Sequence, residues 1–105
     1  MRKFEYRPPR RSSSLTVDFL LGGRTLHGQC LNVSDAGIRV TLDAELPSDS
    51  TGSLTLHHHQ RSLTIEAAVT HLHADTDEVG FSFIFHTPKE RERTRLFLAS
   101  TAEQP

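Results

Sequence analysis

The sequence predicts a mainly β fold, a six-stranded antiparallel β-barrel with a C-terminal α-helix and an N-terminal basic arm. Apolar residues alternate with polar ones in six short segments between residues 15 and 85. Segments rich in glycine, serine, aspartate or histidine separate them, and a helix-start motif follows the last one. Because closing a sheet removes its exposed edges, six short strands joined by tight turns favour a barrel over an open sheet.

The first half of the predicted barrel contains three strands. Alternation over residues 15–21 predicts a half-buried strand, and the glycine pair at 22–23 predicts a hairpin turn after it. Alternation resumes over 26–30 and again over 38–42, on either side of the polar segment NVSDAG at 32–37. Gly28 lies inside the second of these strands, where glycine marks a bulge or a tight bend of a barrel. Cys30 is expected to be a small buried apolar residue of the same strand.

The second half of the barrel and the helix follow the same reasoning. Alternating apolar residues at 54–56, 63–69 and 79–85 predict three more strands, with HHHQRS and HADTDE as the turns between them. Thr87 is the predicted N-cap, Pro88 suits the first helical position, and Glu90 completes a T-x-x-E capping box. Leu96 and Phe97 are expected on one side of this helix.

The length of 105 residues is that of one domain. We expect an arginine-rich arm over 1–14, the barrel and helix over 15–100, and a frayed tail over 101–105. Charge is uneven: residues 1–11 hold five basic side chains and one acidic, whereas the remaining residues hold seven basic and twelve acidic. A basic arm on a mildly acidic body indicates that the arm meets an anion.

The composition also bears on where the protein acts. The single cysteine excludes an internal disulfide, which fits a reducing compartment and predicts a cytoplasmic location. The basic N-terminus has no apolar segment after it, so it is not expected to be a secretory signal. No stretch approaches the roughly 18–20 apolar residues of a membrane span, and membrane insertion is not expected.

Two motifs are expected to meet at one end of the barrel. Arg7 and Arg11 satisfy R-x-x-x-R in the arm, and Asn32, Ser34 and Gly37 satisfy [DN]-x-S-x-x-G. The arm precedes the first strand and the second motif follows the second strand, so one hairpin brings them together. Guanidinium groups match phosphate oxygens and the O6 and N7 atoms of guanine with paired hydrogen bonds. Amide, hydroxyl and glycine add short-range polar contacts and close backbone approach.

The order and spacing of these two motifs resemble the PilZ domain family, the bacterial receptors of cyclic di-GMP. The resemblance extends over the arm, the six strands, the segment VGFSF at 79–83 and the arginine-rich helix. It implies a six-stranded barrel with a terminal helix and a ligand clamped between the arginine arm and the [DN]-x-S-x-x-G region. It implies no cofactor besides that ligand.

The resemblance also implies a role for each motif residue. Arg7 and Arg11 would hold the phosphates and a guanine edge, Asn32 and Ser34 would contact a guanine and a phosphate–ribose edge, and Gly37 would keep the strand entrance open. Arg10 is a third candidate that replaces or joins Arg11. The Pro8-Pro9 pair between the arginines departs from the apolar or aromatic residues expected there, and it bears on whether one or two ligand molecules bind.

Other functions are disfavoured by the residues present. No nucleophile with a placed base, phosphate-binding loop or pair of catalytic carboxylates is evident, so an enzyme is not expected. The run His57–His59 lacks a further ligand set and is expected to be an exposed polar turn, so no metal site is expected. An acidic body with its aromatic residues at core positions argues against a binder of nucleic acid polymers.

Two hypotheses about the function remain from the sequence. The favoured one is a non-catalytic cyclic di-GMP receptor, in which ligand orders the arm and changes a surface offered to a protein effector of unknown identity. The alternative is a module of the same fold that binds proteins and no nucleotide. The arginine pair, which such modules usually lack, separates the two.

Overall fold

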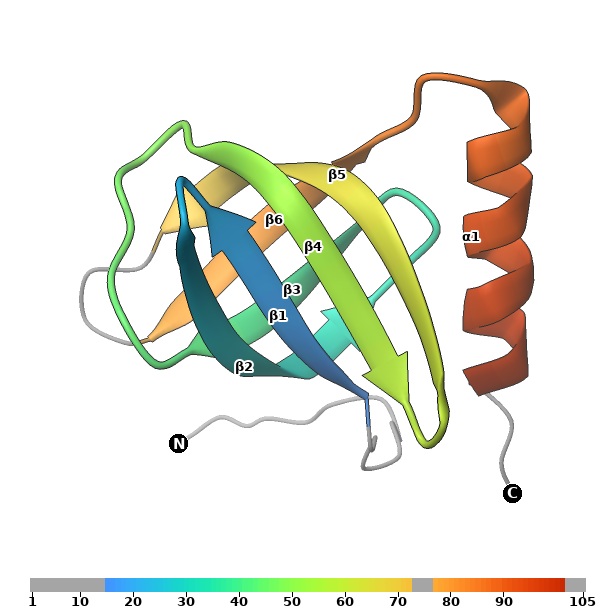
Figure 1. The fold of residues 1–105 in the computed structure, drawn as a ribbon, viewed down its shortest axis with the longest axis horizontal. Helices are drawn as coiled ribbons and strands as arrows, with labels where there is room; N and C mark the ends of the chain where they lie inside the picture. Colours follow the sequence, from blue (N-terminus) through green and yellow to red (C-terminus); the bar gives the residue numbers. More distant parts are fainter. Residues whose placement is uncertain (1–14, 73–76, 102–105) are drawn as a thin grey trace, which may run out of the picture.

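The computed structural model describes residues 15–72 and 77–101, which form a β-barrel with a helix beside it (Figure 1). The described elements are β1 (Thr16–Leu21), β2 (Arg24–Val33), β3 (Gly37–Leu42), β4 (Thr51–His58), β5 (Arg61–Leu72), β6 (Glu78–Ile84) and α1 (Pro88–Thr101). The predicted six-stranded antiparallel barrel with a C-terminal helix is confirmed. The predicted arm lies outside the described residues.

The barrel closes because β1 pairs on both of its edges. The order around it is β1-β2-β3-β6-β5-β4, and all neighbouring strands are antiparallel. On β1, Phe19 lies opposite Leu26 of β2 and opposite Leu54 of β4. The pairing of β1 with β4, which are separated by the whole of β2 and β3 in the chain, is the contact that turns a six-stranded sheet into a barrel.

The core fills the interior with the inward-facing half of each strand. Phe19, Val40, Leu54, Leu56 and Ala67 have no solvent-exposed surface. The ring centroids of Phe19 and Phe81 lie 4.6 Å apart, with the rings tilted by 48°, an arrangement that aromatic pairs favour. The period-two pattern of the sequence is therefore the pattern of burial, since successive side chains of a strand point to opposite faces.

Strand β2 is irregular at two places near the [DN]-x-S-x-x-G motif, a close approach to β3 and a β-bulge. Gly28 approaches β3 so closely that a Cβ atom would lie 1.8 Å from the carbonyl oxygen of Thr41, so only glycine fits there. The register of β2 against β3 shifts between Cys30 and Asn32, which places the β-bulge at Leu31 and not at Gly28. Cys30 packs against the core but is only partly buried, whereas the sequence predicts a buried residue there.

Helix α1 begins where the capping motif predicts. The Thr87 hydroxyl accepts a hydrogen bond from the backbone N–H of Glu90 at 3.2 Å, and the Glu90 carboxylate accepts one from the backbone N–H of His86 at 2.8 Å. The carboxylate thus reaches one residue beyond the N-cap position of a standard capping box.

The buried face of α1 differs from the predicted one. Thr94, Phe97 and Leu98 are buried, at positions i, i+3 and i+4 of one helical face, whereas Leu96 is 55% exposed. The expectation that Leu96 shares the face of Phe97 is therefore wrong, because one residue along a helix turns the side chain by about 100°.

Strand β5 holds the helix near both of its ends. The Arg61 guanidinium donates to the Ser100 hydroxyl at 2.5 Å and lies 5.3 Å from the centroid of the Phe97 ring. At the other end, the His86 ring pairs with the Glu66 carboxylate, and this contact raises the pKa of His86 above its usual value. These polar contacts supplement the apolar contact of Phe97 and Leu98 with the barrel.

The histidine run is not the exposed turn that the sequence predicts. Strand β4 continues through His58, and the turn contains only His59 and Gln60. His59 has a φ of 57°, the left-handed conformation required by the tight turn. The alternating sequence signal ends at Leu56, but backbone pairing of His57 with Ser62 and of His58 with Arg61 extends the strand.

Phe19→Ala should destabilise the barrel strongly, because Phe19 is fully buried at the seam of β1, β2 and β4. We expect a loss of about 3–5 kcal/mol in the free energy of unfolding, measured by urea denaturation. The neighbouring Leu20, which is 48% exposed, provides a matched control. Leu20→Ala should change the free energy by only about 0.5 kcal/mol. Equal losses in the two variants would contradict the assignment of the core face.

Candidate functional site

The loop that joins β2 to β3 contains the centre of the [DN]-x-S-x-x-G motif and is a tight, self-bonded turn. The backbone N–H of Ser34 donates to the carbonyl of Gly37 at 2.9 Å. The Ser34 hydroxyl oxygen accepts a hydrogen bond from the backbone N–H of Ala36 at 3.2 Å. Serine favours such turns because its hydroxyl bonds to the nearby backbone. The hydroxyl hydrogen of Ser34 remains free to donate outward, since the side chain is exposed.

Asn32 lies at the end of β2, directly after the bulge. Its side chain is exposed, and within residues 15–72 and 77–101 it makes no hydrogen bond. A free side-chain amide offers two N–H donors and a carbonyl acceptor to a ligand. Asn32 and Ser34 thus present polar groups to solvent on neighbouring parts of the chain.

Gly37 begins β3 and faces a different constraint. It pairs with Ser82 of β6, and a Cβ atom on Gly37 would lie 2.3 Å from the carbonyl oxygen of Phe81. The adjacent Ala36 carbonyl accepts a hydrogen bond from the backbone N–H of Phe83 at 3.0 Å, which extends the β3–β6 ladder into the loop. The glycine of the motif is therefore required for packing of β3 on β6, independently of any ligand.

The three candidate arginines, Arg7, Arg10 and Arg11, lie outside the described residues. The structure does fix the point from which their segment leaves the barrel. Leu15, the first described residue, accepts a hydrogen bond through its carbonyl from the backbone N–H of Cys30 at 3.1 Å. The start of the barrel is thus attached to β2 two residues before Asn32.

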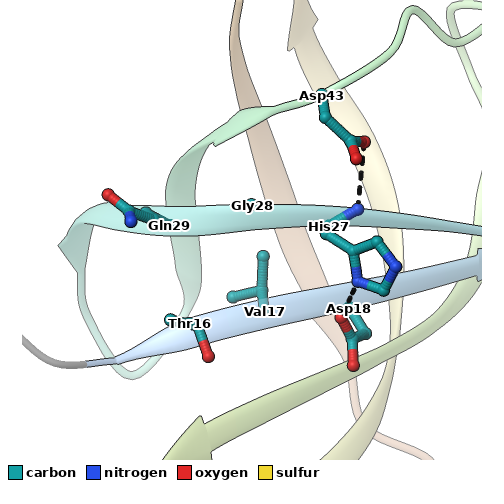
Figure 2. A pocket seen from close by; sticks show the side chains of 7 residues that line it. All are labelled: Thr16, Val17, Asp18, His27, Gly28, Gln29 and Asp43. Carbon is teal, nitrogen blue, oxygen red and sulfur yellow. Dashed lines mark hydrogen bonds and ion pairs between the residues drawn. The ribbon is translucent and has the colours of Figure 1, made fainter.

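The outer face next to this point has a shallow hollow on β1 and β2, and most of the residues that line it are polar (Figure 2). Thr16 and Gln29 lie opposite each other in the register, and the Asp18–His27 pair follows along the strands. The His27 Nδ1 atom lies 2.5 Å from the Asp18 carboxylate, and the His27 backbone N–H donates to Asp43 at 3.1 Å.

A second histidine completes this cluster from the other side of β1. The His57 Nε2 atom lies 2.9 Å from the second carboxylate oxygen of Asp18, so one carboxylate joins side chains of β2 and β4. Sequence reasoning missed this cluster. A signal for half of it existed, because a hairpin turning at Gly22-Gly23 places Asp18 opposite His27. His57 lies 39 residues from Asp18, and only barrel closure brings the two together.

The two histidines determine the charge state of Asp18. Partial burial acts to raise the pKa of Asp18, but hydrogen bonds and charge attraction from His27 and His57 outweigh it and hold the pKa below its usual value. Asp18 thus stays ionised in more acidic solution than an ordinary aspartate.

Helix α1 lies on the side of the barrel to which the β2–β3 loop points (Figure 1). Its Arg95 donates to the Glu92 carboxylate at 2.6 Å, and the pKa of Arg95 is raised mainly by Glu92 and further by the charge of Asp35 in the loop. The loop and the helix are therefore within electrostatic reach of each other.

The described parts of the chain bear on two other kinds of site. In residues 15–72 and 77–101, no three His, Cys, Asp or Glu side chains are arranged to ligate a metal ion. No helix among these residues has the length and apolarity needed to span a bilayer.

The Asp18 cluster should make stability depend on acidity. Because the folded-state pKa of Asp18 is lowered, its contribution is present above the unfolded value of 3.8 and is lost as pH falls through the folded value. Urea denaturation between pH 5 and pH 2 should therefore show a shallower loss of stability in Asp18→Asn than in the wild type. Replacing His27 and His57 together by glutamine should flatten the curve in the same way, and parallel curves for all three proteins would contradict the prediction.

Gly37→Ala should destabilise the protein because the added methyl group meets the backbone of β6. Overpacking of this kind typically costs about 1–3 kcal/mol in the free energy of unfolding, measured by urea denaturation. Ala36→Ser adds one heavy atom at the exposed neighbouring position and should change the free energy by about 0.5 kcal/mol or less. A Gly37→Ala variant as stable as the wild type would show that β3 and β6 are not in such close approach.

Comparison with known proteins is consistent with this architecture. In a structural search, the crystal structure of the PilZ domain of CeSA from a cellulose-synthesizing bacterium aligns with a TM-score of 0.66, covering 82% of this chain and 91% of that chain. The sequences are 14% identical, so this likeness concerns the fold alone. No curated protein matches the sequence. The model of the PilZ domain family matches residues 2–100, and the chain therefore belongs to the PilZ domain family.

Proposed function

We propose that this PilZ domain is a non-catalytic receptor of cyclic di-GMP. The ligand lies between the arginines of the arm and the exposed groups of Asn32 and Ser34. Arg7 and Arg11 bind phosphate oxygens and a guanine edge, with Arg10 as a third cation, and Asn32 and Ser34 supply directional hydrogen bonds. We retain the boundaries 1–14, 15–100 and 101–105 for the arm, the barrel with its helix and the tail.

One observation carries this proposal: the hydrogen bond from the Cys30 N–H to the Leu15 carbonyl at 3.1 Å. It fixes the chain that leads to the arginines beside the strand that leads to Asn32. Arg11 precedes Leu15 by four residues, a length of chain that spans at most about 14 Å. This short tether of Arg11 to the barrel supports the proposal that the two motifs form one site.

The unused hydrogen-bonding groups of the motif support the binding of a ligand. The Asn32 side chain has no hydrogen-bond partner among the described residues, and the Ser34 hydroxyl can donate while its oxygen accepts from Ala36. Neither group is consumed in holding the barrel together. The exposed amide offers donors and an acceptor that match the guanine and phosphate edges of a nucleotide.

The proposed output is a change of surface. Ligand that bridges the arm to the β2–β3 loop orders the arm against the barrel, and an order–disorder change of this kind alters the surface offered to a partner protein. The partner then carries the response, in the cytoplasm, without a catalytic step on this chain. Under the alternative hypothesis, the barrel is a protein-binding module that binds no nucleotide, and the arginines have no ligand.

Calorimetric titration of the purified chain with cyclic di-GMP tests the proposal. We expect saturable binding that GTP and a single-stranded oligonucleotide do not reproduce. Arg7→Ala, Arg11→Ala and Asn32→Ala should each weaken binding by tenfold or more, since hydrogen bonds to charged groups contribute about 1.5–3 kcal/mol. Arg24→Ala, which removes the same charge at the turn end of β2, should bind like the wild type.

Absence of heat at high ligand concentration in the folded wild-type protein would refute the receptor and favour the protein-binding module. Binding that is unaffected by the arm substitutions would instead move the ligand away from the arm.

A further inference from the structure

Arg39 is a basic side chain that neither motif contains, yet the barrel places it beside the [DN]-x-S-x-x-G region. It lies on β3, two residues after Gly37, between the buried Ile38 and Val40. Strand alternation therefore points Arg39 to the outer face. The register pairs it directly with Asn32 of β2, and side chains opposite each other on antiparallel strands have Cβ atoms about 4.5–5.5 Å apart.

The surroundings of Arg39 leave its guanidinium open. The residue is exposed, and in the described parts of the chain its side chain makes no hydrogen bond or ion pair. On its other side it pairs with Gly80 of β6, which has no side chain to cover it. By contrast, Arg61 and Arg95 are both engaged with partners on or near the helix. The guanidinium of Arg39 thus has N–H donors available for a ligand, next to the available side-chain amide of Asn32.

The distribution of charge makes this position notable. After residue 11 the chain has seven basic and twelve acidic side chains, so the body of the protein repels an anion on balance. On β1, β2 and β3 the basic side chains are Arg24 and Arg39. Arg24 pairs with Leu21 at the hairpin turn, roughly 25 Å from the end of β2. Arg39 is therefore the basic side chain that these strands bring to the motif.

We propose that Arg39 is a further ligand-contacting residue, which donates a pair of hydrogen bonds to an acceptor pair of the nucleotide. This inference rests on the proposed cyclic di-GMP function. The acceptor pair is either two phosphate oxygens or the O6 and N7 atoms of a guanine, the two groups that match the planar guanidinium fork. Arg39 provides a donor-only group next to Asn32, whose amide both donates and accepts. Such a pair is suited to holding one base or one phosphate from the barrel side.

The test is titration of cyclic di-GMP into Arg39→Ala, Arg39→Gln and the matched control Arg24→Ala. Loss of a charge-assisted fork should weaken binding by about ten- to a hundredfold in both Arg39 variants. Arg39→Gln keeps part of the stem and ends in a neutral amide, so it removes the charge and the fork. Arg24→Ala removes the same charge from the same sheet and should bind within about twofold of the wild type. Thermal unfolding of each variant checks that the exposed substitutions leave the fold intact.

A second ligand identifies the acceptor pair. In an analogue of cyclic di-GMP with 7-deazaguanine bases, carbon replaces N7. If Arg39 contacts the guanine edge, Arg39→Ala costs less affinity for the analogue than for cyclic di-GMP, because one of its partners is already missing. If Arg39 contacts phosphate, the loss is the same for both ligands.

The outcomes separate this inference from the proposed function. If the wild type binds cyclic di-GMP and Asn32→Ala weakens binding, but both Arg39 variants bind like the wild type, the receptor stands and the role of Arg39 is overturned. If Arg24→Ala weakens binding as much as Arg39→Ala, the effect is one of overall charge and the direct contact is overturned. If the folded wild type binds no cyclic di-GMP, the proposed function itself fails, and this inference fails with it.

Discussion

Pairing of β1 with β4 is the interaction on which the rest of the structure depends. Without it the six strands would form an open sheet with two exposed edges and one solvent-facing apolar side. With it, Phe19 lies at a seam between Leu26 and Leu54 and has no exposed surface. The same pairing brings His57 to Asp18, so the polar cluster on the outer face is also a product of closure.

Closure also determines what the outer face can bind. In a filled small barrel the interior is occupied by side chains, and polar ligand contacts must come from the outward half of each strand and from the loops. Here Thr16, Gln29, Asn32 and Arg39 belong to that outward half, next to the self-bonded turn at Ser34. The bulge at Leu31 is what restores Asn32 to the outer face after Cys30 has turned inward. A single extra residue in β2 thus decides whether the motif amide meets solvent or core.

The glycine of the motif and its polar residues have different physical roles. Gly37 permits the close approach of β3 to the Phe81 carbonyl, whereas Asn32 and Ser34 keep free hydrogen-bonding capacity. A motif that is continuous in the sequence is therefore part scaffold and, in the proposed function, part recognition surface. The proposed contact of Arg39 would extend the recognition part to a residue outside the motif, through the cross-strand register and not through sequence spacing.

The sequence by itself determined the strands, the helix start and the barrel, because period-two burial and a threonine cap with proline and glutamate are local signals. It also predicted that the chain enters the barrel at the end of β2 that carries Asn32, since a single hairpin relates them, and the structure places Leu15 beside Cys30 there. The positions of Arg7, Arg10 and Arg11 stay predictions. Only the tertiary structure decided the buried face of α1, the extent of β4 into the histidine run and the partners of Asp18. It also decided the pairing of Arg39 with Asn32. These four features depend on register, on a bulge and on contacts between strands far apart in the chain. No local sequence pattern indicates such contacts.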